Sequence, residues 1–161
     1  MVHRLPSTQP DALVKQLLHP RQFSSSATEW GRKHEPVALL AYIKMAGVVV
    51  TKAGFVISPE HQFLGASPDG YVHDPVATEQ SGLVEIKCPY KFRDQTPNNA
   101  ATDSSFYGAL VDGLPQLKVS HNYYCQIQGQ MAITKRSWCD FVVFTTRGIA
   151  VERIHSDSGF W

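Results

Sequence analysis

Apolar residues recur with roughly the period of an α-helix over residues 28–45. Ser26 or Thr28 is suited to cap the N-terminus of such a helix, and Gly47 is suited to end it in a left-handed conformation. Pro36 lacks the backbone N–H that a helix interior uses. The pattern therefore predicts a helix that either begins just before this proline or kinks at it.

A second helical pattern covers residues 121–134, and it has two distinct faces. Side chains three or four positions apart lie on the same side of a helix. The apolar face carries Tyr124, Ile127 and Met131, and the other face carries Tyr123, Gln126 and Gln130. We expect the apolar face to pack on a sheet and the second face to border a cleft, the alternative being ordinary solvent-facing glutamines.

Short runs of β-branched and aromatic residues predict strands between the two helices and after the second one. These runs cover residues 48–50, 55–57, 63–66, 71–73, 83–88, 141–144 and 149–151. The last two are continuously apolar, which predicts central strands that are buried on both faces. Residues 74–82 and 98–105 are predicted loops, and residues 106–117 give mixed signals.

The order of helix, strands, helix and strands predicts an α/β (α+β) fold in which helices flank a mixed central β-sheet. A doubly wound nucleotide-binding fold is not indicated, because neither GxGxxG nor GxxxxGK occurs in the sequence. Residues 1–27 are rich in proline, serine and glutamine and form a poorly defined segment with a short helix predicted at residues 11–18. Residues 28–161 are predicted to form one domain.

Composition limits the cellular compartment of the protein and argues against a zinc site and a serine hydrolase. No apolar run approaches the about 20 residues that span a bilayer, and no secretory signal pattern begins the chain. Cys88, Cys125 and Cys139 are not spaced as a zinc site, so we expect free thiols in a reducing, intracellular compartment, with nucleus and cytoplasm both open. A serine hydrolase is not indicated, since the GxSxG motif is missing from the sequence.

The net charge of +1 leaves nucleic-acid binding open, because phosphate-neutralising cations need only line one groove. Basic residues gather in two groups, Lys87 with Lys91 and Arg93, and Lys118 with Lys135 and Arg136. Each of them, taken alone, is equally typical of a solvated surface.

Candidate chemistry centres on the predicted strand that contains Glu85-Ile86-Lys87. Residues two apart on a strand project from one face, so Glu85 and Lys87 lie side by side while Ile86 points into the core. Carboxylates bind Mg²⁺, and an adjacent ammonium can position water or stabilise charge, as phosphodiester hydrolysis requires. Asp69, in a turn before a strand, and Glu35, on the first helix, can add two further carboxylates.

Each of these residues also has an ordinary alternative reading. An E-x-K pattern on a strand commonly forms a weak ion pair on a solvated face. Asp69 follows Ser67-Pro68 as a turn former would, and Glu35 suits a helix N-terminus. Only their combination points to one site.

That combination resembles a known family, the YqaJ-type viral recombinase domain, which includes the phage lambda exonuclease and belongs to the PD-(D/E)XK nuclease superfamily. The matching motifs are Trp30-Gly31-Arg32-Lys33-His34-Glu35, Gly65-Ala66-Ser67-Pro68-Asp69-Gly70, Leu83-Val84-Glu85-Ile86-Lys87-Cys88-Pro89 and Tyr123-Tyr124-Cys125-Gln126-Ile127-Gln128-Gly129-Gln130-Met131. The resemblance extends over residues 28–154 and implies a PD-(D/E)XK restriction-endonuclease-like core.

The resemblance also implies roles for individual residues. Asp69 and Glu85 would be the metal-binding carboxylates, and the backbone carbonyl of Ile86 a further ligand. Lys87 would orient or activate the attacking water. Glu35 and Gln126 would complete the catalytic set, and the residues that contact DNA would be Tyr123, Arg93 and Lys91. For Arg93, an ion pair with Asp94 is the alternative.

The implied function is a Mg²⁺-dependent deoxyribonuclease, with Mn²⁺ as a possible substitute, acting as an exonuclease in recombination or DNA end processing. Linear duplex ends would be its substrate, and a single-strand annealing protein and further copies of the chain its partners. The alternatives are an endonuclease of the same superfamily and a non-cleaving module that binds DNA or a partner.

Two departures from the family pattern qualify these expectations. Family members precede the first motif with an Arg and a Ser or Thr that grip a 5′-phosphate, for which Arg21 and Ser24–Ser26 are a poor match. Family members also continue with further helices where this chain ends at Trp161. We therefore expect a nuclease core without these flanks.

Overall fold

A five-stranded sheet, in the order β1-β4-β5-β8-β9, forms the centre of the structure, a computed structural model that describes residues 24–160. Its strands are β1 (Val49–Lys52), β4 (Gly70–His73), β5 (Ser81–Lys87), β8 (Trp138–Thr145) and β9 (Gly148–His155). β5 pairs antiparallel with β4 and parallel with β8, which confirms the predicted mixed sheet. The helix predicted at residues 11–18, Arg21 and Trp161 lie outside the described residues.

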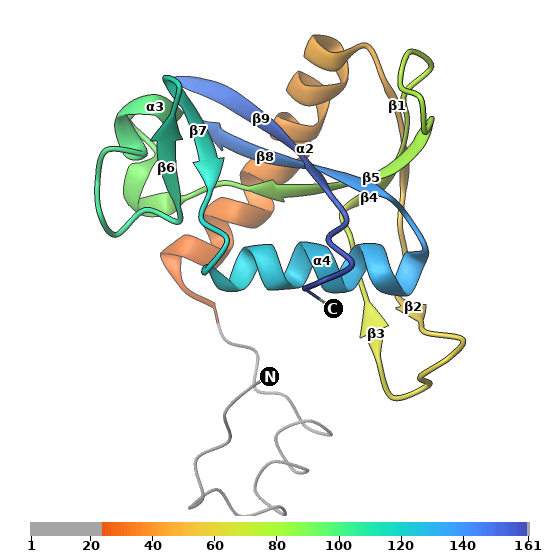
Figure 1. The fold of residues 1–161 in the computed structure, drawn as a ribbon. Coiled ribbons are helices and arrows are strands. Elements are labelled where there is room, and N and C mark those ends of the chain that lie inside the picture. Colours follow the sequence, from red (N-terminus) through yellow and green to blue (C-terminus); the bar gives the residue numbers. More distant parts are fainter. Residues whose placement is uncertain (1–23, 161) are drawn as a thin grey trace, which may run out of the picture.

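Helix α2 (Ser26–Ala46) covers one face of the sheet and α4 (Asn122–Thr134) covers the other (Figure 1). Ala38 and Tyr42 of α2 pack with Val84 and Val142 of the sheet. On the opposite face, the core includes Ile127 and Met131 of α4, packed with Leu83, Phe141 and other buried side chains. The predicted apolar face of the second helix is thus confirmed.

The boundaries of α2 differ from the prediction. Ser25, not Ser26 or Thr28, is the N-cap, because the Ser25 hydroxyl accepts from the Thr28 backbone while the Thr28 hydroxyl accepts from the Ser25 backbone. The helix runs through Pro36 instead of beginning there. Packing of α2 on the sheet offsets the missing backbone hydrogen bond. Gly47 ends the helix at a φ of 67°, as predicted.

The prediction of two central strands near the C-terminus is half right. β8 lies between β5 and β9 and is buried almost throughout, whereas β9 is an edge strand whose residues are mostly half-buried. Its apolar run is explained by neighbours on both faces, α2 on one and the β6–β7 hairpin with α3 on the other. An apolar run alone does not distinguish a central strand from a covered edge.

The remaining elements are short and flank the sheet. They are β2 (Val56–Ile57), β3 (Gly65–Ala66), η1 (Tyr90–Phe92), α3 (Pro97–Ala100), β6 (Gly108–Val111) and β7 (Leu114–Leu117). The β2–β3 hairpin extends away from the sheet beside α4 (Figure 1). The β6–β7 hairpin occupies the segment whose pattern was mixed. Within residues 24–160, none of the helices has the length and apolar character that crossing a membrane requires.

Candidate active site

Strand β5 divides its side chains between the two faces of the sheet. Val84 and Ile86 are buried in the core beneath α2. Glu85 and Lys87 point to the opposite face, where they meet α4. This alternation is the two-residue period of a strand, so the local sequence determines which side chains reach the α4 side.

Glu85 is the centre of a hydrogen-bonded cluster, although its side chain is only 3% exposed. Its Oε1 accepts from Lys87 Nζ at 2.5 Å and from Gln126 Nε2 at 2.8 Å. Its Oε2 accepts from Gln130 Nε2 at 2.9 Å. A buried carboxylate with one ammonium and two amide donors is a satisfied anion that is held in a defined orientation.

Asp69 reaches the same place from the neighbouring strand. Gly70 pairs with Val84 at the start of β4, so the turn that precedes β4 runs alongside the end of β5. Asp69 Oδ2 accepts from the Ile86 backbone N–H at 2.7 Å. Its carboxylate therefore lies at the backbone of the residue that follows Glu85, and it comes from the turn that leads into the neighbouring strand β4.

The surroundings of Asp69 change its acidity. Burial and the charge of Glu85, and to a smaller extent that of Glu35, raise the pKa of Asp69 to about 6. The hydrogen bond from Ile86 and the charge of Lys87 act in the opposite direction but do not cancel the effect. A carboxyl group whose pKa is raised by burial and a nearby carboxylate is typical of a functional site, and a bound cation would offset both effects.

Lys87 connects this acidic pair to the polar face of α4. Its Nζ lies 4.5 Å from the centre of the Tyr123 ring, in addition to its bond to Glu85. The Lys87 side chain is 20% exposed, so the ammonium remains within reach of a solvent-borne substrate. Tyr123, Gln126 and Gln130 thus all border the cluster, as the predicted second face of this helix requires.

Glu35 lies on the exposed side of α2, and its link to the cluster is electrostatic. Besides its effect on Asp69, its charge acts together with burial and the charge of Asp69 to raise the pKa of Cys88 to about 11. A thiol with so high a pKa remains protonated at neutral pH, which suits an inert packing role. Glu35 is therefore near the acidic pair but does not converge on it as Asp69 does.

Lys91 and Arg93 lie after β5, and the structure does not bring them into the cluster. Lys91 Nζ bonds to Ser105 Oγ and lies 3.5 Å from Asp103. Arg93 lies 4.3 Å from the centre of the Tyr90 ring, and its Nε lies 3.4 Å from Asp94. The ion pair named as the alternative reading of Arg93 is thus present.

The donor set suits a hard divalent cation. Two carboxylates, from Asp69 and Glu85, lie next to the backbone of Ile86, whose carbonyl is the third expected ligand. Mg²⁺ is commonly held by one or two carboxylates and keeps several waters. Among the described residues, no group of three or more His, Cys, Asp or Glu side chains is arranged to hold a metal.

Gln130 is the site residue to which the sequence assigned no role. It was placed on the same helical face as Gln126, yet it is only 3% exposed and bonds Glu85 directly. Its spacing of four residues from Gln126 was the available signal. Whether that face was buried or exposed depended on how α4 sits over the sheet, which the helical period does not specify.

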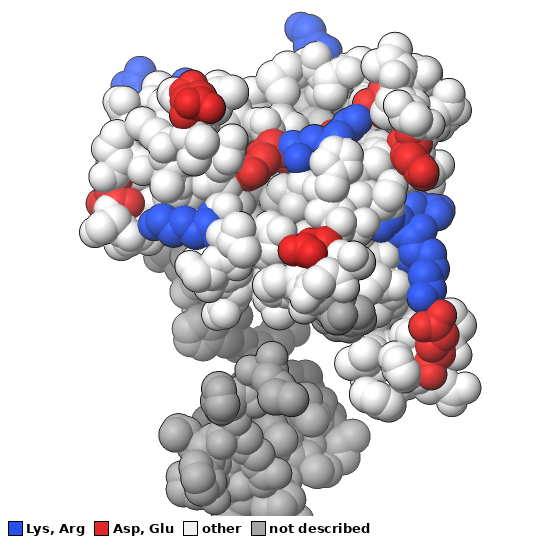
Figure 2. Space-filling view, viewed as in Figure 1, with Lys and Arg blue, Asp and Glu red and all other residues white. Residues whose placement is uncertain are grey.

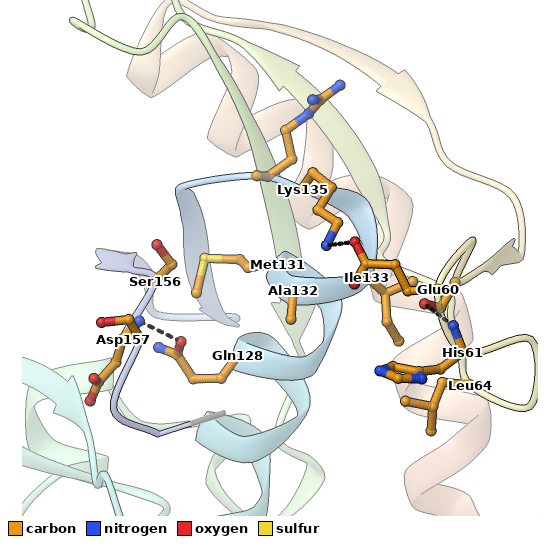
Figure 3. Close-up of a pocket in the computed structure, with 13 residues that line it drawn as sticks. Glu60, His61, Leu64, Gln128, Met131, Ala132, Ile133, Lys135, Ser156 and Asp157 are labelled. Carbon is orange, nitrogen blue, oxygen red and sulfur yellow. Dashed lines mark hydrogen bonds and ion pairs between the residues drawn. The ribbon is translucent and has the colours of Figure 1, made fainter.

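Two hollows border α4. A groove of about 380 Å³ adjoins the cluster and is lined by Leu64, Gly65, Ala66, Ser67, Cys125, Gln126, Gly129, Gln130 and Ile133. A second hollow of about 440 Å³ lies between the β2–β3 hairpin and another side of α4, where Lys135 pairs with Glu60 (Figure 3). Only the first hollow includes residues that bond Glu85.

Acidic and basic side chains are interspersed over the face of the described residues that Figure 2 shows. This mixture agrees with the near-neutral net charge of +1. Lys and Arg side chains on this face would therefore bind a polyanion at individual grooves and not over one broad basic surface.

Comparison with known proteins identifies a family for this chain. The chain matches the family model of the YqaJ-like viral recombinase domain over residues 8–137. It is 27% identical over 117 residues to an uncharacterised protein of Acanthamoeba polyphaga mimivirus, which covers 70% of this chain and 19% of that protein. The chain thus spans only a small part of this viral relative.

Solved structures of exonucleases share this fold. The chain resembles an alkaline exonuclease from Laribacter hongkongensis with 32% identity and a TM-score of 0.66, covering 91% of this chain and 67% of that one. The complex of that exonuclease with dAMP gives 31% identity and a TM-score of 0.68, over 92% and 67% of the two chains. A phage-related exonuclease from Haemophilus somnus shares the fold at 17% identity and a TM-score of 0.58.

These matches agree with the mixed sheet, the two covering helices and the acids at the start of β4 and on β5, which together make a PD-(D/E)XK-type fold. The family match covers most of the chain and includes the segments that carry Asp69, Glu85 and Gln126. The chain belongs to the YqaJ-like viral recombinase domain family.

Proposed function

We propose that this chain is a metal-dependent DNA nuclease that acts as an exonuclease on linear duplex ends. The observation that carries the proposal is the convergence of Asp69 and Glu85 beside the Lys87 ammonium at the end of one strand. Family membership and the two Laribacter exonuclease structures support it.

In the proposed mechanism, Asp69, Glu85 and the carbonyl of Ile86 hold Mg²⁺, with Mn²⁺ as a substitute. When bound there, the ion would supply charge neutralisation at the scissile phosphate and would make water more acidic. Lys87 orients the attacking water or stabilises the charge that develops on the phosphate. Gln126 and Tyr123 keep Glu85 and Lys87 in place through the contacts described above. Glu35 adds negative charge near the metal.

The substrate strand would follow the groove beside Gln126 and Gln130, the two amides that donate to Glu85. That the Laribacter structure was solved with dAMP supports a site sized for a nucleoside monophosphate. We assign the activity to recombination or DNA end processing, where an annealing protein and further copies of this chain would be partners. Lys91 and Arg93, outside the cluster, would contact the DNA backbone.

Degradation of labelled DNA tests the proposal directly. Linear duplex and covalently closed circles are incubated with the protein and Mg²⁺, and then with the Lys87→Ala and Glu85→Ala variants. We expect the linear substrate alone to be degraded, and each substitution to lower the rate by about 100-fold or more. Lys44→Ala, which removes an exposed lysine from the far end of α2, is the matched control and should leave the rate unchanged.

Different outcomes separate the alternatives. Cutting of closed circles would assign the protein to the endonucleases. Binding without degradation by the folded wild type would favour the non-cleaving module. Circular dichroism of each variant checks that a lost rate does not reflect a lost fold.

A further inference from the structure

The amide of Gln130 has no task in the proposed mechanism, although it makes a direct bond to the central carboxylate. Its Nε2 donates to Glu85 Oε2 at 2.9 Å, and the residue is 3% exposed. We infer that Gln130 is a positioning residue that fixes the orientation of the Glu85 carboxylate and so sets the affinity of the site for a divalent cation. The inference rests on the proposed function.

The two oxygens of Glu85 are held differently. Lys87 and Gln126 both bond to Oε1, so together they restrain only one end of the carboxylate. A group held at one oxygen can still swing its other oxygen about that point. Among the described residues, Gln130 is the one side chain that donates to Oε2. It therefore removes the rotation that Lys87 and Gln126 leave free.

Burial makes the Gln130 contact more rigid than the one from Gln126. Gln126 is exposed, so its side chain has other rotamers available in solvent. Gln130 lies inside the packing between α4 and the sheet, where few rotamers fit. Of the two amides, Gln130 is the better suited to hold Glu85 before any ligand arrives.

Gln130 also carries an energetic disadvantage that folding alone does not explain. Its Oε1 is buried and has no hydrogen-bond partner among the described residues. An unsatisfied buried amide oxygen destabilises a fold, and an apolar side chain of similar size would avoid it. Reversing the amide would place oxygen against the Glu85 carboxylate, so the donor assignment is secure. The advantage of an amide at position 130 is therefore its hydrogen bond to Glu85.

Residues that orient a metal-binding carboxylate tune the affinity for the metal. A ligand fixed in the productive orientation loses less freedom when the metal binds. Glu85 Oε1 already accepts two hydrogen bonds, whereas Oε2 accepts one and retains a second lone pair that a cation can use. Loss of the Gln130 donor should therefore weaken metal binding without removing a ligand.

Gln130→Met tests the inference, because methionine matches the length of glutamine and has no donor. Binding of Mn²⁺ to the purified full chain is measured without DNA, from the electron paramagnetic resonance signal of free Mn²⁺. We expect the dissociation constant to rise by about tenfold or more. The Mg²⁺ concentration that gives half-maximal nuclease activity should rise in parallel.

Gln128→Met is the matched control. Gln128 lies on the same helix and is 2% exposed, but it donates to the His155 carbonyl and accepts from the Asp157 backbone N–H, at 2.9 Å each. Its loss should lower the unfolding temperature and leave the Mn²⁺ dissociation constant unchanged. A purely structural role for Gln130 would make the two variants behave alike.

Three results would overturn the inference. The first is wild-type Mn²⁺ affinity in folded Gln130→Met. The second is failure of both Gln130→Met and Gln130→Leu to fold, which would assign Gln130 to the framework of the protein. The third is a wild-type protein that neither binds Mn²⁺ nor degrades DNA, which would refute the proposed function itself and is distinguishable from the first two.

Discussion

Asp69 and Glu85 place two carboxylates at one end of the sheet, where Lys87 is the cation in direct contact with Glu85. The repulsion is visible in the pKa of Asp69, which burial and Glu85 raise to about 6 from an ordinary value of 3.8. A site that binds a cation must keep this repulsion in the metal-free state. Asp69 therefore lowers the stability of the metal-free protein and favours binding of a cation.

Asp69→Asn should stabilise the metal-free protein at neutral pH. Folded Asp69 holds its proton up to about pH 6, whereas the unfolded chain releases it near 3.8. Stability from this group therefore falls as pH rises through that interval, and the full penalty is present at pH 7. We expect urea unfolding in EDTA to show a gain of about 1 to 3 kcal/mol at pH 7, disappearing below about pH 4.

Asp94→Asn is the control for that measurement, since the Asp94 side chain is 70% exposed. Its stability should stay within about 0.5 kcal/mol of wild type at both pH values. Added Mg²⁺ should stabilise wild type but not Asp69→Asn. Equal stability of wild type and Asp69→Asn at pH 7 in EDTA would show that the carboxylates do not oppose each other.

Single residues of the site differ in how far the sequence predicts them. The two-residue period of a strand puts Glu85 and Lys87 on one face, and family resemblance points to Asp69 and Gln126. The bond between Asp69 and the Ile86 backbone, and the burial of Gln130, depend on how β4 and α4 meet β5. No local pattern contains that information.

At the scale of elements, a buried polar network fastens the edge strand β9 to the sheet and to α2. Arg153 donates to both oxygens of Asp140, at 2.8 and 2.9 Å, and lies 2.9 Å from Asp74. The Tyr42 hydroxyl donates to Asp140 at 2.6 Å, and burial together with this carboxylate raises the pKa of Tyr42. Asp140 is only 2% exposed, so its charge depends on these partners.

Arg153→Met should destabilise the fold by about 3 to 5 kcal/mol, because it leaves the buried Asp140 carboxylate without its counter-ion. Arg147→Met, at the exposed turn between β8 and β9, should cost less than about 0.5 kcal/mol. Chemical denaturation measures both. Nuclease activity per folded molecule should be the same in both variants. If Arg153→Met lowered the free energy of unfolding by as little as Arg147→Met does, the network would not hold β9.

Elements with strong local signals are predicted best. The Gly47 end of α2, the apolar face of α4 and the strand around Glu85 all follow from short sequence patterns. The passage of α2 through Pro36 and the edge position of β9 do not, because packing between distant segments decides both. Tertiary contacts overrode the local preferences there.

At the scale of the whole molecule, the mixed sheet with a helix on each face creates the site by bringing three separate segments together. The turn before β4 supplies Asp69, β5 supplies Glu85 and Lys87, and α4 supplies the amides (Figure 1). The order of elements was sufficient to predict this architecture. The two strands of the β2–β3 hairpin were predicted at residues 55–57 and 63–66, but the position of this hairpin beside α4 and the groove there depend on tertiary packing.

The most direct test of the account is the location of Mn²⁺ by anomalous diffraction from crystals of the protein grown or soaked with the ion. We predict an anomalous peak bound by the carboxylates of Asp69 and Glu85 and the carbonyl of Ile86, and no such peak in Asp69→Asn. A peak elsewhere, for example beside Glu60 in the second hollow, or side chains of Asp69 and Glu85 that do not share the ion, would contradict it.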